Sequence, residues 1–142
     1  MKRLRRLRWM LLSGFLSCCL IPVLAFAAPL TEQQKIDALI HSVEVLPGAQ
    51  FIRNGSTYDG KAAADHLRMK RRYAGSRITT AEEFIDRCAS QSSFSGRPYL
   101  IRFANGKTVD SGDYFRAELR RIEARSANAQ PGATHVPVSR NG

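Results

Sequence analysis

Tyr99-Leu100-Ile101-Arg102-Phe103 is the clearest β-strand in this sequence of 142 residues. Its aromatic and branched side chains are typical of strands, and Asn105-Gly106 just after it is a turn signal. A shorter strand is predicted at Phe51-Ile52-Arg53, which Asn54-Gly55 ends. Because two short strands pair more readily in the antiparallel sense, we expect these two to form an antiparallel ribbon.

Four helices are predicted around these strands. They begin at Thr31, Asp59, Thr80 and Ser111, each of which is a favourable N-cap residue. Both threonines start a capping box, with Gln or Glu three residues later. Apolar residues at helical spacing follow the first and the last of these caps. The predicted fold is therefore α+β and mostly helical, with about four helices and a short two-stranded antiparallel ribbon.

The first 27 residues are predicted to be an export signal. Five basic residues and no acidic ones precede an apolar run of about 15 residues, which is shorter than the roughly 20 of a membrane-spanning helix. Ala25-Phe26-Ala27 fits the pattern that signal peptidase cuts. We expect cleavage after Ala27 and a periplasmic protein. An uncleaved anchor and a lipoprotein modified at Cys18 or Cys19 are the alternatives.

The rest of the chain is predicted to be one small domain, residues 28–125, followed by a disordered tail, residues 126–142. Five of the 22 Lys and Arg lie in the predicted signal, whereas all 12 Asp and Glu lie beyond it, so the net charge after cleavage is +5. This charge permits attraction to anionic envelope surfaces. The basic residues are too scattered among too few aromatics to predict binding of nucleic acid.

Cys88 is the single cysteine beyond the predicted signal, which excludes an intramolecular disulfide after cleavage. We interpret it as a small core residue on the third helix. The sequence has no Cys and His set with zinc spacing and no Gly-rich phosphate loop. We therefore predict no metal site and no cofactor.

His66 lies beside the apolar face of the second predicted helix. One interpretation is a part-buried histidine hydrogen-bonded to a backbone carbonyl or to Asp59 or Asp65. The other is a group that contacts a ligand or transfers a proton. Nearby basic residues form either a binding patch or a solvated face, namely Arg53, Arg68, Lys70, Arg71 and Arg72.

The loop at 90–98 is rich in serine, and it also has two interpretations. Ser93 or Ser95 could act as a nucleophile with His66 as base, although neither a G-x-S-x-G nor an S-x-x-K motif is present. Alternatively, the loop presents hydroxyl and N–H groups to an anion or a sugar, with Arg97 adding charge. We favour the second interpretation.

Two blocks of the sequence resemble a known family. The first block is 51–55 with Tyr58 and 66–70, and the second is 80–85 with 92–99. Together they resemble the YfeK-like family of small exported bacterial proteins, a domain of unknown function, over about residues 30 to 125. The resemblance implies a periplasmic protein of Gram-negative bacteria and implies no activity. Cys88 lies outside the family's pattern.

The leading hypothesis is a binding or accessory protein without catalysis, which contacts an envelope component or a partner protein. The predicted ligand-binding residues are Arg53, Asn54, Tyr58, His66, Ser93, Ser95, Arg97 and Tyr99. An antiparallel ribbon would bring the turn after the first strand and the loop before the second to one end of the domain. The alternatives are a small envelope hydrolase that uses a loop serine with His66, and a basic adaptor that docks on anionic lipid or peptidoglycan. No catalytic residue is assigned, and the sequence favours a protein that is not an enzyme.

Overall fold

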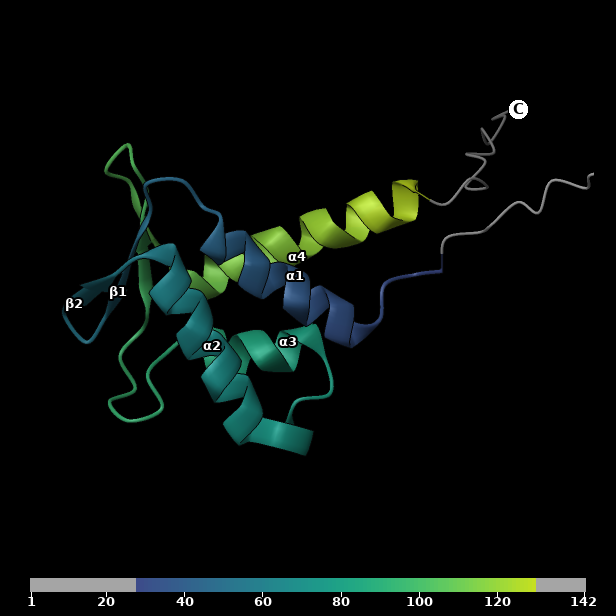
Figure 1. Ribbon diagram of the computed structural model, residues 1–142, viewed down its shortest axis with the longest axis horizontal. Coiled ribbons are helices and arrows are strands. Elements are labelled where there is room, and N and C mark those ends of the chain that lie inside the picture. Colours follow the sequence, from purple (N-terminus) through teal and green to yellow (C-terminus); the bar gives the residue numbers. More distant parts are fainter. Residues whose placement is uncertain (1–27, 130–142) are drawn as a thin grey trace, which may run out of the picture.

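A computed structural model describes residues 28–129 of the chain (Figure 1). The helices are α1 (Glu32–Glu44), α2 (Gly60–Ala74), α3 (Ala81–Phe84) and α4 (Ser111–Asn128). A 3₁₀ turn, η1 (Gly75–Arg77), follows α2, and a π-helical segment, η2 (Ile85–Ala89), continues α3. The strands are β1 (Gln50–Arg53), β2 (Ser56–Tyr58), β3 (Leu100–Arg102) and β4 (Thr108–Asp110). The predicted signal, residues 1–27, and residues 130–142 of the predicted tail lie outside the described residues.

The predicted α+β class and the antiparallel pairing of the two predicted strands are confirmed. Strands β1 and β3 pair antiparallel, with Phe51 opposite Ile101. They are the central strands of a four-stranded antiparallel sheet with the order β2-β1-β3-β4, so the sheet has two strands more than the predicted ribbon. Both extra strands are only three residues long, too short to show a period of two.

Each additional strand arises because an Asn-Gly turn folds the chain back onto the strand before it. Asn54 and Gly55 have φ values of 50° and 83°, the left-handed conformation that a two-residue hairpin turn needs at both positions. This turn places Arg53 opposite Ser56. Gly106 has a φ of 85° in the second hairpin, where the Phe103 N–H donates to the Lys107 carbonyl oxygen over 2.8 Å.

The core lies between the helices and one face of the sheet. In Figure 1 the sheet is at the left, the helices extend from it to the right, and α1 and α4 run side by side. Phe51 and Ile101 are the buried residues of the central strands. From the helices the largest fully buried side chains are Phe84, Phe115, Ile36, Leu39, Ile40, Ile85, Val43 and Cys88.

Three of the four predicted helix starts are confirmed. Thr31, Asp59 and Thr80 are N-caps, and both threonines form the complete capping box. The fourth prediction is wrong by one residue. Asp110 is the N-cap of α4, because its carboxylate accepts from the Gly112 N–H over 2.9 Å, whereas the Ser111 N–H bonds to the Tyr99 carbonyl oxygen.

Helix α4 extends to Asn128, so residues 126–128, which the sequence assigns to the tail, are helical. No glycine or proline stands between Gly112 and Pro131 to end the helix earlier. Helix α4 therefore ends three residues beyond the predicted boundary, and the division into domain and tail stays a prediction.

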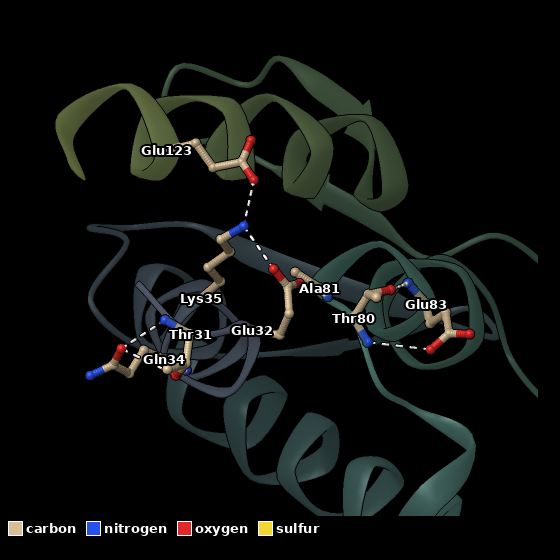
Figure 2. Close-up of polar contacts among 8 residues, drawn as sticks. All are labelled: Thr31, Glu32, Gln34, Lys35, Thr80, Ala81, Glu83 and Glu123. Carbon is tan, nitrogen blue, oxygen red and sulfur yellow. Dashed lines mark hydrogen bonds and ion pairs between the residues drawn. The ribbon is translucent and has the colours of Figure 1, made fainter. Parts of the chain in front are cut away.

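A polar network joins the start of α1 to α3 and α4 (Figure 2). The Glu32 carboxylate accepts from the Ala81 N–H over 2.7 Å and from the Lys35 ammonium over 2.8 Å. Lys35 also donates to Glu123 over 2.8 Å. These contacts hold the pKa of Glu32 below its usual value, chiefly through the hydrogen bond from Lys35. Lys35 thus connects α1 to α4.

Candidate functional site

A cleft of about 550 Å³ lies where the β1–β2 turn, the second half of α2, η2 and the serine-rich loop meet. Its walls combine cationic, hydroxyl and aromatic side chains. The lining residues are Arg53, Asn54, His66, Lys70, Tyr73, Ala74, Arg77, Arg87, Cys88, Ser92, Ser93, Phe94 and Tyr99. The volume lies within the roughly 300–1,000 Å³ of small-molecule sites.

Arg53, His66 and Tyr99 form a hydrogen-bonded series in the wall of this cleft. The Arg53 Nη1 lies 2.7 Å from the His66 Nδ1, and the His66 Nε2 lies 3.3 Å from the Tyr99 hydroxyl. Arg53 also donates to the Tyr58 hydroxyl over 3.0 Å and stacks 4.7 Å from the centre of that ring. The series connects β1, α2 and the residue before β3.

His66 is a neutral hydrogen-bond acceptor in this arrangement. A guanidinium has no acceptor, so the His66 Nδ1 must accept from Arg53, and the ring proton is on Nε2, facing Tyr99. Burial, followed by the charges of Arg53 and Lys70, lowers the pKa of His66 from 6.5 to about 4. The partners predicted from the sequence, Asp59 and Asp65, bond elsewhere: Asp59 caps α2, and Asp65 pairs with Lys61 and Arg68.

The low pKa of His66 predicts a loss of stability in mild acid. The unfolded chain binds a proton at histidine near pH 6.5 but the folded chain only near 4, so this contribution is complete above pH 6.5 and is lost as the pH falls toward 4. Allowing for solvent screening of a part-buried ring, we expect a loss of about 1 kcal/mol between pH 7 and pH 5. Urea unfolding at the two pH values measures it.

The control for this experiment is His66→Gln, which retains an acceptor for Arg53 but does not titrate. Its stability should change much less over the same interval. The carboxyl groups with lowered pKa, such as Glu32 and Glu83, stabilise the fold above about pH 4.5 and lose that contribution mainly below it, outside the interval tested. An equal loss in the wild type and the variant would contradict the assignment to His66.

Lys70, which the sequence placed in the possible basic patch but not among the predicted ligand-binding residues, lines the cleft. Its ammonium donates to the Gln91 carbonyl oxygen over 2.8 Å and lies 3.4 Å from the Tyr99 hydroxyl, 5.1 Å from the centre of that ring. Burial lowers the pKa of Lys70. Lys70 stands four residues after His66, and helical spacing alone places both on one face of α2.

Other cleft residues that the prediction omitted are Tyr73, Arg77, Arg87, Ser92 and Phe94. Tyr73 is 80% exposed and Phe94 is 99% exposed, so both offer bare ring surface at the rim. Phe94 gave a signal in the sequence, since it is the one large apolar residue within a polar loop. The arginines could not be found in this way, because they follow from how η1 and η2 are placed in the fold.

Among the described residues, the cations of the cleft have no carboxylate partner, and the cleft gathers four of them in one place. Within residues 28–129, Arg53, Lys70, Arg77 and Arg87 form no ion pair with a carboxylate. The described residues that line the cleft include no Asp or Glu. By contrast, Arg68 of α2 pairs with Glu44 and Asp65 outside the cleft. Positive charge is therefore concentrated in the cleft without compensation.

The π-helical segment η2 contributes Arg87 and Cys88 to the cleft. Such segments are rare and often occur at functional sites. Cys88 is 1% exposed, as the sequence predicted for a core residue, and burial raises the pKa of its thiol. A buried thiol with a raised pKa is a poor nucleophile.

The serine-rich loop packs against the β1–β2 turn, as the antiparallel pairing predicts. The Ser95 hydroxyl donates to the Asn54 side-chain oxygen over 2.6 Å, and the Asn54 amide donates to the Ser92 hydroxyl over 3.3 Å. Arg97 supports the loop through its backbone, since its carbonyl oxygen accepts from the Ser92 N–H over 2.9 Å.

Five of the eight predicted ligand-binding residues line the cleft, namely Arg53, Asn54, His66, Ser93 and Tyr99. Tyr58 lines a neighbouring cavity and touches Arg53. Ser95 and Arg97 shape the loop, and neither lines the cleft. The geometry thus brings five of the predicted residues into one cleft and leaves Tyr58, Ser95 and Arg97 outside its lining.

A family profile described as a family of unknown function (DUF5329) matches residues 30–123, most of the described domain. The chain belongs to DUF5329. This DUF5329 chain is also 40% identical over 68 residues to the uncharacterized protein YfeK of Salmonella typhimurium strain LT2, a match that covers 48% of the chain. The chain spans 57% of the length of that relative. The resemblance to YfeK-like proteins is thereby confirmed, and no solved structure matches the DUF5329 chain.

Among residues 28–129, no helix has both the length and the apolar character to cross a membrane. Over the same range, no three His, Cys, Asp or Glu side chains gather in a way that could hold a metal ion.

Proposed function

We propose that this protein is a non-catalytic binding protein that holds an anionic group of an envelope component in the cleft. The proposal rests on four cations that line the cleft, namely Arg53, Lys70, Arg77 and Arg87. Among the described residues, the lining has no acidic residue, and none of the four pairs with a carboxylate, unlike Arg68 and Arg71. An anion in the cleft would supply the missing counter-charge and accept charge-assisted hydrogen bonds. Ser93 adds a hydroxyl donor of the kind that phosphate and carboxylate groups accept.

We propose an envelope component as the ligand because the sequence predicts an export signal. Cleavage after Ala27 would place the domain in the periplasm, where phosphorylated lipids and glycans supply anionic groups. The exposed rings of Tyr73 and Phe94 at the rim offer apolar contact to the part of a ligand that carries the anion.

The geometry favours binding over the hydrolase alternative. Both ring nitrogens of His66 are engaged, by Arg53 and by Tyr99, and burial opposes protonation of the ring. A general base needs a free nitrogen within reach of the nucleophile. Ser95 instead donates to Asn54. Within residues 28–129, no hydrogen bond joins His66 to a serine.

The cleft also favours a defined anion site over the adaptor alternative. A surface that docks on anionic lipid or peptidoglycan needs cations spread over an exposed face. Here Lys70 is part-buried, and it is positioned by contacts to Gln91 and Tyr99. Such fixed donors suit a single group such as a phosphate better than a diffuse charged surface.

Removal of two exposed cations of the cleft tests the proposal. Inorganic phosphate is titrated into the purified protein, and binding is followed by amide chemical shifts. We expect Arg77→Gln/Arg87→Gln to weaken phosphate binding about tenfold or more, because each lost charge–phosphate contact contributes on the order of 1 kcal/mol. Both side chains are exposed, so the fold should be unaffected.

The matched control is Arg102→Gln/Arg120→Gln, which removes the same charge from exposed positions of β3 and α4 outside the cleft. This control should keep phosphate affinity within about twofold of the wild type. Equal weakening in both double variants would show a general charge effect. That outcome, or no binding by the wild type, would overturn the proposed function.

A further inference from the structure

A second cavity of about 220 Å³ lies behind the cleft, between the sheet, the start of α2 and the start of α4. Its walls are mostly apolar. They include Phe51 and Leu100 from the sheet, Ala63 and Leu67 from α2, Ala89 from η2 and Phe115 from α4. Within the described residues, the charged or titratable members of this lining are Arg53, Tyr58, His66 and Tyr99.

Three of those four residues also line the cationic cleft. Arg53, His66 and Tyr99 belong to both walls, and they are joined in series by the contacts of 2.7 Å and 3.3 Å. They therefore form a thin polar partition, with a basic hollow on one side and an apolar hollow on the other. No other residue is shared by the two linings.

We propose that the ligand is an anionic amphiphile, with its phosphate or carboxylate head in the cleft and a short length of its alkyl chain in the apolar cavity behind the partition. This inference rests on the proposed anion-binding function and names the class of ligand. A ligand with a charged end and a hydrocarbon end can occupy the cationic cleft and the apolar cavity at the same time. Hydrocarbon suits the second cavity because its apolar walls offer few partners to water.

The partition between the cleft and the cavity can open when the head group binds. Arg53 donates to a neutral acceptor, the His66 Nδ1. A phosphate is a stronger acceptor for a guanidinium than a neutral imidazole, because the bond is charge-assisted and can be bidentate. Arg53 would therefore turn from His66 to the head group, and the space between these two side chains would admit the chain.

A comparison of methyl phosphate with hexyl phosphate tests the inference. Both carry the same head, and only the second can reach the apolar cavity. Each buried methylene contributes roughly fourfold in affinity, so a chain that is only partly accommodated should still bind at least tenfold more tightly than methyl phosphate. Affinities are measured by calorimetry or amide shift titration of the purified protein.

Ala63→Leu is the variant for this experiment, because Ala63 is part-buried and lines the apolar cavity but not the cleft. The larger side chain should fill the cavity, remove most of the hexyl gain and leave methyl phosphate affinity unchanged. Ala117→Leu, the same change on α4 away from both hollows, is the control and should preserve the gain. Retained methyl phosphate binding also shows that each variant is folded.

A second measurement does not depend on any variant. Nuclear Overhauser effects from the terminal methyl of hexyl phosphate should reach Leu67 of α2 and Phe115 of α4, which both line the cavity. Equal affinity for the two phosphates, or a hexyl gain that persists in Ala63→Leu, would overturn the amphiphile inference while anion binding stands. Failure of both phosphates to bind would overturn the proposed function, and this inference with it.

Discussion

Replacing Phe84 by alanine should lower the free energy of unfolding by about 3–5 kcal/mol, the usual cost of deleting a buried phenyl ring. Phe84 is 0% exposed and ends α3, where the helix passes into the π-helical segment. The ring belongs to the core cluster, so its loss would leave a cavity there. Because domains of this size are stable by only about 5–15 kcal/mol, the variant should be close to unfolding at 37 °C.

Phe94→Ala is the matched control, since the chemical change is identical and the ring is 99% exposed. Its stability should stay within about 0.5 kcal/mol of the wild type. Guanidinium unfolding of the two variants side by side measures the difference. Similar losses in both would mean that the loop ring is buried in solution, contrary to the structure.

Gly60→Ala should destabilise the domain by about 2–3 kcal/mol, although alanine is the better helix former. Gly60 is the first residue of α2, and it lies against the end of α1. A Cβ there would overlap the Val43 carbonyl oxygen and stand 3.0 Å from the Glu44 carbonyl oxygen. Backbone atoms cannot move aside alone, so the two helices would have to separate.

Gly112→Ala is the comparison that isolates this effect. Gly112 also lies in the first turn of a helix, but its Cβ would meet the Ser90 hydroxyl, 2.7 Å away, which is a side chain. We expect a smaller loss, which Ser90→Ala in the same chain partly restores. Thermal unfolding measures all three proteins. If Gly60→Ala were as stable as the wild type, the close approach of α1 and α2 would be wrong.

Local signals in the sequence were sufficient for most of the helices and for the central pair of strands. Capping boxes at Thr31 and Thr80 act through neighbouring residues only, and both appear in the structure as predicted. The strand β3 is equally short, but Tyr99 and Phe103 extend it to a run of five strand-forming residues, whereas β2 and β4 lack such flanks and were missed. The Asn-Gly turns before them were recognised as turns but were not taken to imply a returning strand.

The candidate site could be predicted only in part. Arg53 and Tyr99 were found because they belong to or border recognisable strands, and His66 because it lies beside the apolar face of a predicted helix. Arg77 and Arg87 join the cleft through tertiary packing, which no short sequence pattern encodes. Within the described part of the chain, the four cleft cations lack carboxylate partners, which supports the proposed function, and this becomes visible only when the ion pairs of the folded domain are known.

The contact between Lys35 and Glu123 has a consequence for how the chain acquires its structure. The two residues are 88 positions apart, and α1 packs against α4 along the same seam. A growing polypeptide therefore cannot complete this domain until its last helix has been synthesised. Until then the side of α1 that packs against α4 stays uncovered, although α2 and α3 can already contact the helix. If the chain is exported as the sequence predicts, late completion of the domain would keep it unfolded during transport.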